Sequence, residues 1–117
     1  MPLTRDSLKD YFIQGIKKLD DLQVGVEWEK IGAYRDTLKA IRYSGPRGVE
    51  AIFKALIRRN GWEPLTHGPH IIALKKRGAY ITLEPGGQIE LSGQKSRTLD
   101  KNASELYGHL EEIKKIS

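Results

Sequence analysis

The sequence of 117 residues contains no cysteine. This absence excludes disulfide bonds, thiolate metal ligands and a cysteine nucleophile, and it fits a reducing compartment, so we expect a cytoplasmic protein. No apolar run approaches the roughly 20 residues that a membrane-spanning helix needs. The first residues also lack the apolar core of a signal peptide and the acid-poor character of a transit peptide. We therefore expect a mature amino terminus and no membrane partner.

Several enzyme motifs are missing as well. No serine stands in a nucleophile-elbow pattern. The pair Gly86-Gly87 lies between two expected strands and not ahead of a helix, so it is neither a Walker-type nor a dinucleotide-type phosphate loop. The sequence therefore identifies no catalytic side chain.

The charge balance is mildly basic, with 20 Lys and Arg against 15 Asp and Glu and a net charge of +5. Such an excess can steer anionic ligands such as nucleotides toward a protein. Nucleic-acid binding is the weakest of the three functions that we consider, below an enzyme and a non-catalytic binding chain, because no basic stripe interleaved with aromatic residues is present. We expect no nucleic-acid partner.

The hydrophobic pattern predicts an α+β fold in a single domain spanning residues 1–117, with an antiparallel β-sheet and helices packed on one face. Residues 71–92 are expected to form a three-stranded meander, and residues 22–30 and 33–43 further extended segments. Residues 62–70, including His67 and His70, are expected to form an exposed loop. Helices are predicted from Thr4 to about residue 18, over residues 49–60 and from about Thr98 onward. We expect their apolar stripes to pack in the core: Leu8, Tyr11, Phe12 and Ile16 in the first helix, and Leu99, Ala103, Leu106, Leu110 and Ile113 in the last.

The predicted hairpin at residues 80–93 has two different faces. Side chains alternate along a strand, so the apolar residues Ile81, Leu83, Ile89 and Leu91 share one face. The opposite face carries Glu84, Gln88, Glu90 and Ser92. The polar face is the one on which we expect chemistry.

An earlier strand carries a second pair of carboxylates, Glu27 and Glu29, which lie two residues apart and so share a face. If both are ionised in a partly buried cleft, a divalent cation would relieve their repulsion. The alternative is an ordinary strand with an acidic solvent face.

A turn at residues 44–48 precedes the second helix. Free amides at the start of that helix, beside Arg47, could hold an anion. The alternative is a turn and a helix start without a ligand.

These residues resemble the amino-terminal part of glutamate–cysteine ligases of the plant and proteobacterial type. The resemblance covers nearly the whole chain, and its last motif is specific. In order, the motifs are Val24-Gly-Val-Glu27-Trp-Glu29-Lys30-Ile-Gly32, Tyr43-Ser-Gly-Pro-Arg-Gly-Val49, Gly61-Trp-Glu-Pro64, Ile71-Ile-Ala-Leu74 and Ile81-Thr-Leu-Glu-Pro-Gly-Gly-Gln-Ile-Glu-Leu-Ser-Gly93.

The resemblance implies part of a glutamine-synthetase-like carboxylate–amine ligase fold. It implies that ATP phosphorylates the γ-carboxylate of glutamate and that the amine of cysteine then forms γ-glutamylcysteine, the first step of glutathione biosynthesis. Magnesium, or manganese in its place, would accompany ATP. The implied metal ligands are Glu27, Glu29, Glu84 and Glu90, and the implied substrate contacts are Gln88, Ser92, Lys30 and Arg47.

The sequence departs from the resemblance at Trp28, Ile31 and Gln94-Lys95, and most of all in length. We expect an amino-terminal fragment of a larger catalytic domain that is inactive alone and self-associates through apolar surface. The second hypothesis is a non-catalytic remnant or subunit that binds a metal or a small carboxylate, or that completes another chain.

Overall fold

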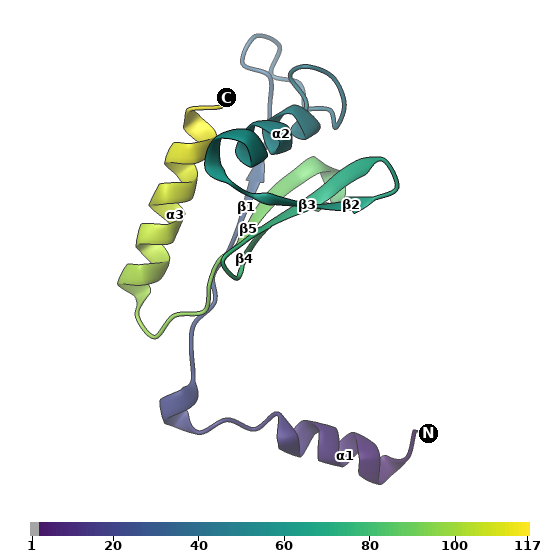
Figure 1. Cartoon of the computed structure of the whole chain (residues 1–117), viewed down its shortest axis with the longest axis vertical. Coiled ribbons are helices and arrows are strands. Elements are labelled where there is room, and N and C mark those ends of the chain that lie inside the picture. The colour runs from purple at the N-terminus through teal and green to yellow at the C-terminus, as the bar shows by residue number, and fades with distance from the viewer. Residues whose placement is uncertain (1–2) are drawn as a thin grey trace.

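The sheet has five antiparallel strands in the order β1-β5-β4-β3-β2, with helices on one of its faces (Figure 1). The structure is a computed structural model that describes residues 3–117. The predicted α+β class, with an antiparallel sheet and helices on one face, is confirmed. The strands are β1 (Glu27–Ile31), β2 (Glu63–His67), β3 (His70–Lys76), β4 (Ala79–Glu84) and β5 (Gln88–Ser92). The helices are α1 (Arg5–Gln14), α2 (Val49–Asn60) and α3 (Leu99–Lys114), with short 3-10 turns η1 (Leu19–Asp21) and η2 (Pro85–Gly87).

The predicted meander is confirmed as β3, β4 and β5. Its first turn contains Arg77 and Gly78, both with positive φ, and its second contains Gly86 and Gly87, whose positive φ suits glycine. The predicted loop at residues 62–70 is wrong in part, because most of it forms β2 and the start of β3. All five residues of β2 are exposed, and Pro64 is tolerated because β2 is an edge strand.

Helix α2 packs on the sheet and builds the core. Its buried residues Phe53 and Leu56 contact a cluster that includes Leu74, Ile81 and Leu91 from three strands. The helix ends at Gly61 in the left-handed conformation, as predicted. At its start, a Cβ atom on Gly48 would lie 2.5 Å from the carbonyl oxygen of Tyr43, so only glycine fits there.

Helix α1 corrects a prediction. Thr4 caps it as expected, since the amide of Ser7 donates to the Thr4 Oγ1 at 3.1 Å, but the helix ends at Gln14. Its apolar stripe is not core: Tyr11 is 73% exposed, Phe12 72% and Ile16 75%, with Leu8 also exposed. Figure 1 shows α1 projecting away from the sheet. An apolar stripe shows that a face favours burial, but it does not say where the covering surface lies.

Helix α3 begins after Thr98 as predicted, but its packing face differs. Leu99 is 69% exposed, and Ala103 and Leu110 are exposed too, so this part of the predicted seam is wrong. Leu106 and Ile113 are partly buried. The fully buried residues of α3 are the polar Asn102 and His109.

The two extended segments are shorter than predicted. Val24 forms only an isolated bridge with Ser96, and β1 starts at Glu27. In residues 33–43, Ala33 pairs with Ala40 in an isolated bridge. Within the described residues, no helix has both the length and the apolar character required to cross a membrane.

The buried His109 predicts a pH dependence of stability. Burial is the main cause that lowers the pKa of His109 from 6.5 to about 4, and the nearby positive charge of Lys30 lowers it further. The carboxylate of Glu112 opposes this shift. Between these two pH values the unfolded chain binds more protons at this residue than the folded chain does. The free energy of unfolding should therefore fall by up to about 3 kcal/mol as pH decreases from 6.5 to 4.

Urea unfolding at several pH values measures this effect. In His109→Leu this component of the pH dependence should be lost, whereas His67→Leu, which replaces an exposed histidine, should leave the wild-type profile unchanged. Equal pH profiles for wild type and His109→Leu would contradict the assignment.

Candidate metal and substrate face of the sheet

The strand register brings the predicted carboxylates to one face of the sheet. In β1 and β5, Glu27 lies opposite Ser92 and Glu29 lies opposite Glu90. Residues that lie directly opposite in an antiparallel pair point to the same side. The β4–β5 register adds further residues to this side. We call this side the carboxylate face; it comprises Glu27, Glu29, Tyr80, Thr82, Glu84, Gln88, Glu90 and Ser92.

Helices α2 and α3 pack against the other face. Ile81 and Leu91, which alternate with the residues of the carboxylate face, are buried against Phe53 of α2. The carboxylate face remains open, since Glu27 and Glu29 are exposed and Glu90 is half-buried. The acidic side chains are therefore accessible to a ligand from solvent.

Like charges meet at the centre of the carboxylate face. Glu29 and Glu90 are direct cross-strand partners, an arrangement that destabilises a sheet when both are ionised. The Ser92 Oγ donates a hydrogen bond of 2.6 Å to the Glu90 Oε1 and so orients this carboxylate. The Thr82 Oγ1, opposite Glu90 on β4, is buried and has no hydrogen-bond partner among residues 3–117. A cation between the two carboxylates would remove the repulsion.

The fit to a metal ion is partial. Within residues 3–117, no group of three or more His, Cys, Asp or Glu side chains is close enough to hold a metal ion. Magnesium, however, is commonly bound through one or two carboxylates, with water and phosphate oxygens as its other ligands. Glu29 and Glu90 can provide that number of protein ligands, so the donor set suits magnesium only when water or a substrate supplies the rest.

A pocket of about 670 Å³ lies at the Glu27 end of this face. Tyr80, Ser92, Arg77 and Lys95 also line it. Sequence reasoning left out Tyr80, Arg77 and Lys95 as site residues. The alternation of β4 places Tyr80 on the polar face, whereas no sequence signal marks the other two.

The structure does not bring Lys30 to the carboxylate face. Lys30 lies opposite Ile89, on the helix-covered side, and its Nζ donates to the Trp28 carbonyl oxygen at 2.9 Å. Burial lowers the pKa of Lys30, while the negative charge of Glu90 acts in the opposite direction.

Arg47 is engaged elsewhere. Its guanidinium donates two hydrogen bonds of 3.0 Å to Asp36 and lies 4.8 Å from the centre of the Tyr34 ring. The bonds from Arg47 lower the pKa of Asp36, and the same contact raises that of Arg47.

The start of α2 does not offer free amides to an anion, so of the two alternatives the structure supports a turn and a helix start without a ligand. The amide of Val49 donates to the Arg42 carbonyl oxygen at 2.9 Å, and that of Glu50 donates to the Tyr43 carbonyl oxygen at 3.0 Å. These bonds occupy the donors that an anion would need.

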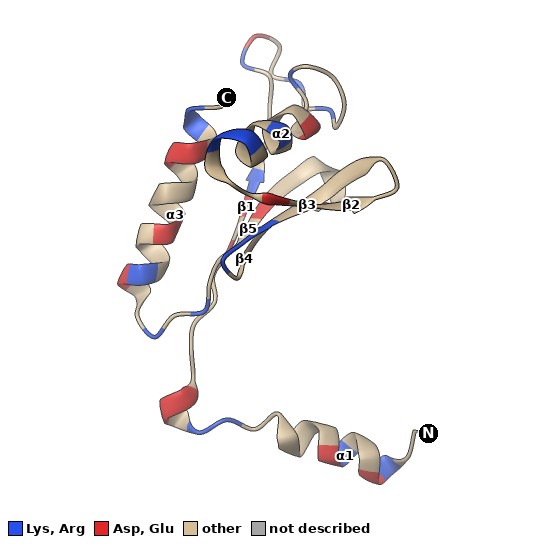
Figure 2. Cartoon of the chain, in the orientation of Figure 1, with Lys and Arg blue, Asp and Glu red and all other residues tan. Residues whose placement is uncertain are grey.

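Basic residues are spread over α2, α3 and the loops and alternate with acidic ones (Figure 2).

The concentration of carboxylates on one side of a helix-backed antiparallel sheet is consistent with part of a ligase fold. The chain belongs to the glutamate-cysteine ligase family 2 (GCS2), which matches residues 23–117.

Curated relatives agree with this family. The chain is 36% identical over 115 residues to the chloroplastic glutamate–cysteine ligase B of Oryza sativa subsp. japonica, covering 98% of this chain and 23% of the relative. It is 36% identical over 116 residues to the chloroplastic enzyme of Arabidopsis thaliana and 34% identical to that of Medicago truncatula, covering 99% of this chain and 22% of each relative. The chain thus spans less than a quarter of these proteins. Their chloroplastic names overturn the expectation of a cytoplasmic location.

The opposed carboxylates predict a stabilising substitution. Without a divalent cation and at low salt, Glu29→Gln should raise the free energy of unfolding by about 0.2–1 kcal/mol, because it removes the repulsion with Glu90. The gain should shrink as salt is added. Urea unfolding measures it. The matched control is Glu63→Gln, which removes an ion pair with Lys75 and should give no gain; loss of stability in Glu29→Gln would contradict the interpretation.

Proposed function

We propose that this chain supplies the metal and glutamate side of an ATP-dependent glutamate–cysteine ligase site. The observation that carries the proposal is the placement of Glu29 opposite Glu90, with Glu27 and Ser92 beside them, on the open face of the sheet. The family match gives this arrangement its chemical context. The reaction would join glutamate to cysteine through γ-glutamyl phosphate.

The proposed roles follow from what phosphoryl transfer requires. That reaction depends on charge neutralisation and positioning more than on covalent help from the protein. Glu29 and Glu90, with Glu27 and Glu84 on the same face, would hold Mg²⁺ or Mn²⁺, which supplies positive charge next to the phosphates of ATP. These carboxylates would orient the ion, and the Ser92 hydroxyl holds Glu90 in place.

The remaining polar residues would contact substrate. Gln88 extends the carboxylate face beyond Glu90, and the Ser92 end opens into the pocket that Arg77 and Lys95 line. Cations at that end would attract a phosphate or the carboxylate of glutamate. Lys30 and Arg47 are weaker candidates for such contacts, since each is engaged away from this face.

The reaction should require more polypeptide than this chain provides. The chain spans 22–23% of its relatives, so residues that contact ATP and cysteine would come from the rest of the enzyme. We therefore expect the chain alone to release no ADP when it is supplied with Mg-ATP, glutamate and cysteine.

Calorimetric titration with Mg²⁺ and Mn²⁺ tests the metal role directly. The chain should bind either ion weakly, and the double substitution Glu27→Gln with Glu29→Gln should abolish the heat of binding. The matched control replaces two exposed acidic residues of α3, Asp100→Asn with Glu111→Gln, and should bind as wild type does. Identical titrations for the two double variants would remove the carboxylate face from consideration.

A second function, that of a non-catalytic subunit that completes another chain, is favoured by the surface of α1. Tyr11 and Phe12 on this projecting helix, and Ile16 just after it, are each more than 70% exposed. Adjacent exposed apolar side chains of this size mark association sites. Without its partner, the chain would use this surface to self-associate.

Light scattering measures the association. The wild-type chain should form oligomers, and Tyr11→Ser with Phe12→Ser should shift it toward the monomer. A control on the same helix, Lys9→Ser with Asp10→Ser, changes polar positions and should leave the mass unchanged. A monodisperse wild-type monomer would count against this surface.

A further inference from the structure

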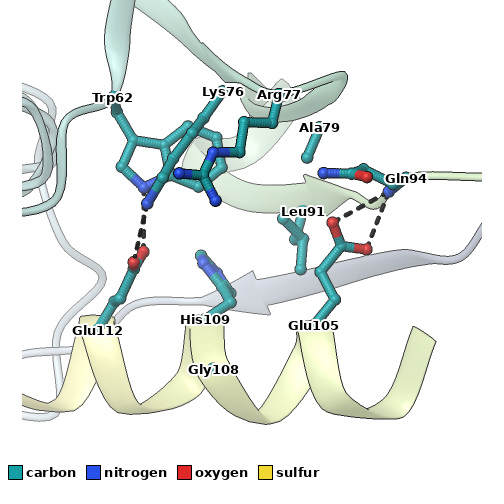
Figure 3. A pocket seen from close by; sticks show the side chains of 10 residues that line it. All are labelled: Trp62, Lys76, Arg77, Ala79, Leu91, Gln94, Glu105, Gly108, His109 and Glu112. Atoms are coloured by element: carbon teal, nitrogen blue, oxygen red, sulfur yellow. Dashed lines mark hydrogen bonds and ion pairs between the residues drawn. The ribbon is translucent and has the colours of Figure 1, made fainter. Parts of the chain in front are cut away.

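A second pocket lies on the helix-covered side of the sheet, between α3 and the β3–β4 turn (Figure 3). Its volume is about 190 Å³. We call it the α3 pocket; it is lined mainly by Trp62, Lys76, Arg77, Glu105, His109 and Glu112. None of the proposed metal ligands lines it.

The two carboxylates of the α3 pocket already have donors. The Glu112 side chain accepts a bond of 3.0 Å from the Trp62 Nε1 and one of 3.3 Å from the Lys76 Nζ. The Glu105 carboxylate accepts from the backbone amide of Gln94, at 3.1 Å and 2.9 Å. Both acidic groups are therefore used in holding α3 against the sheet.

His109 is the group without a partner. It is only 3% exposed, and neither ring nitrogen makes a hydrogen bond to any residue that the structure describes. Figure 3 shows its imidazole pointing from α3 toward the guanidinium of Arg77. A neutral imidazole offers one N–H donor and one acceptor, and buried polar groups of this kind nearly always have a partner. His109 itself lines the α3 pocket.

The lining of the α3 pocket holds two cations and two carboxylates, and Lys30 adds a positive charge close to His109. Lys76 and Arg77 are the two cations, and Lys30 is close enough to help lower the pKa of His109. The charge of Lys76 is matched by Glu112. Arg77 presents a planar fork of N–H donors, which suits the two oxygens of a carboxylate.

We propose that the α3 pocket binds a small carboxylate anion, with Arg77 donating to the carboxylate oxygens and His109 donating its ring N–H. The volume corresponds to roughly six water molecules, which suits a carboxylate of two or three carbons. None of the proposed metal ligands lines the α3 pocket, so anion binding there does not require the proposed metal site. Arg77 and Gln94 also line the pocket beside Glu27, so an anion here would occupy a residue that the two pockets share.

A titration with sodium acetate at pH 7, followed by the imidazole NMR signals, tests the site. The His109 signal should shift and saturate, while those of His67 and His70 should not follow it. Sodium chloride at equal ionic strength should cause no saturable shift. A second arm uses aspartate blocked at both ends, because a protein side chain could supply the same carboxylate; saturation by either probe supports the site, and the tighter probe identifies the source.

Arg77→Gln is the decisive variant, because Arg77 is exposed and its loss should not prevent folding. It should weaken acetate binding by about tenfold or more. The control Arg5→Gln removes the same charge from the exposed surface of α1 and should bind as wild type does. No saturable shift of His109 with either probe, or equal affinity in wild type and Arg77→Gln, would overturn the proposal and leave the pocket to solvent.

Discussion

The pairing of β1 with β5 determines which side of the sheet carries the carboxylates. Because side chains alternate, a slip of one residue would turn Glu27 and Glu29 toward the helices. Backbone bonds beyond the strands support the observed register: the Gly93 amide donates to the Val26 carbonyl oxygen at 2.8 Å, and Val24 and Ser96 form a bridge. On the opposite side, Leu91 is 2% exposed in the core. Packing behind the sheet thus holds Glu29 against Glu90 despite their like charge.

Much of the fold could be predicted where a local pattern and the tertiary structure agree. The β4–β5 hairpin has period-two alternation and a glycine-rich turn, and α2 has both a stripe and a terminal glycine. Helices α1 and α3 form where they were predicted, but the prediction of their packing faces failed, because an apolar stripe does not say what will cover it. Phe12 and Leu99 are exposed, while the polar His109 is buried. Strand β2 was missed because an exposed edge strand needs no alternation.

The candidate site was predictable to the extent that alternation determines it. Alternation alone placed Glu27 with Glu29 and Glu90 with Ser92, but the pairing that joins these two sets is a long-range contact that a single sequence does not encode locally. The same alternation puts Lys30 on the other face from Glu29. The structure therefore follows the alternation, and it does not support the substrate contact that the resemblance implied for Lys30. The Asp36–Arg47 ion pair joins two loop segments and had no sequence signal.

The most direct test of the account uses the absence of cysteine from the chain. Glu29→Cys combined with Glu90→Cys introduces two thiols at directly opposed positions, where the Cβ atoms of an antiparallel pair lie about 4.5–5.5 Å apart and small adjustments allow a disulfide. Mild oxidation should cross-link this pair readily within one chain. The control variant combines Glu29→Cys with Ile89→Cys, whose side chains would lie on opposite faces, and it should not cross-link. Preferential cross-linking of the second pair would contradict the register, and with it the shared carboxylate face.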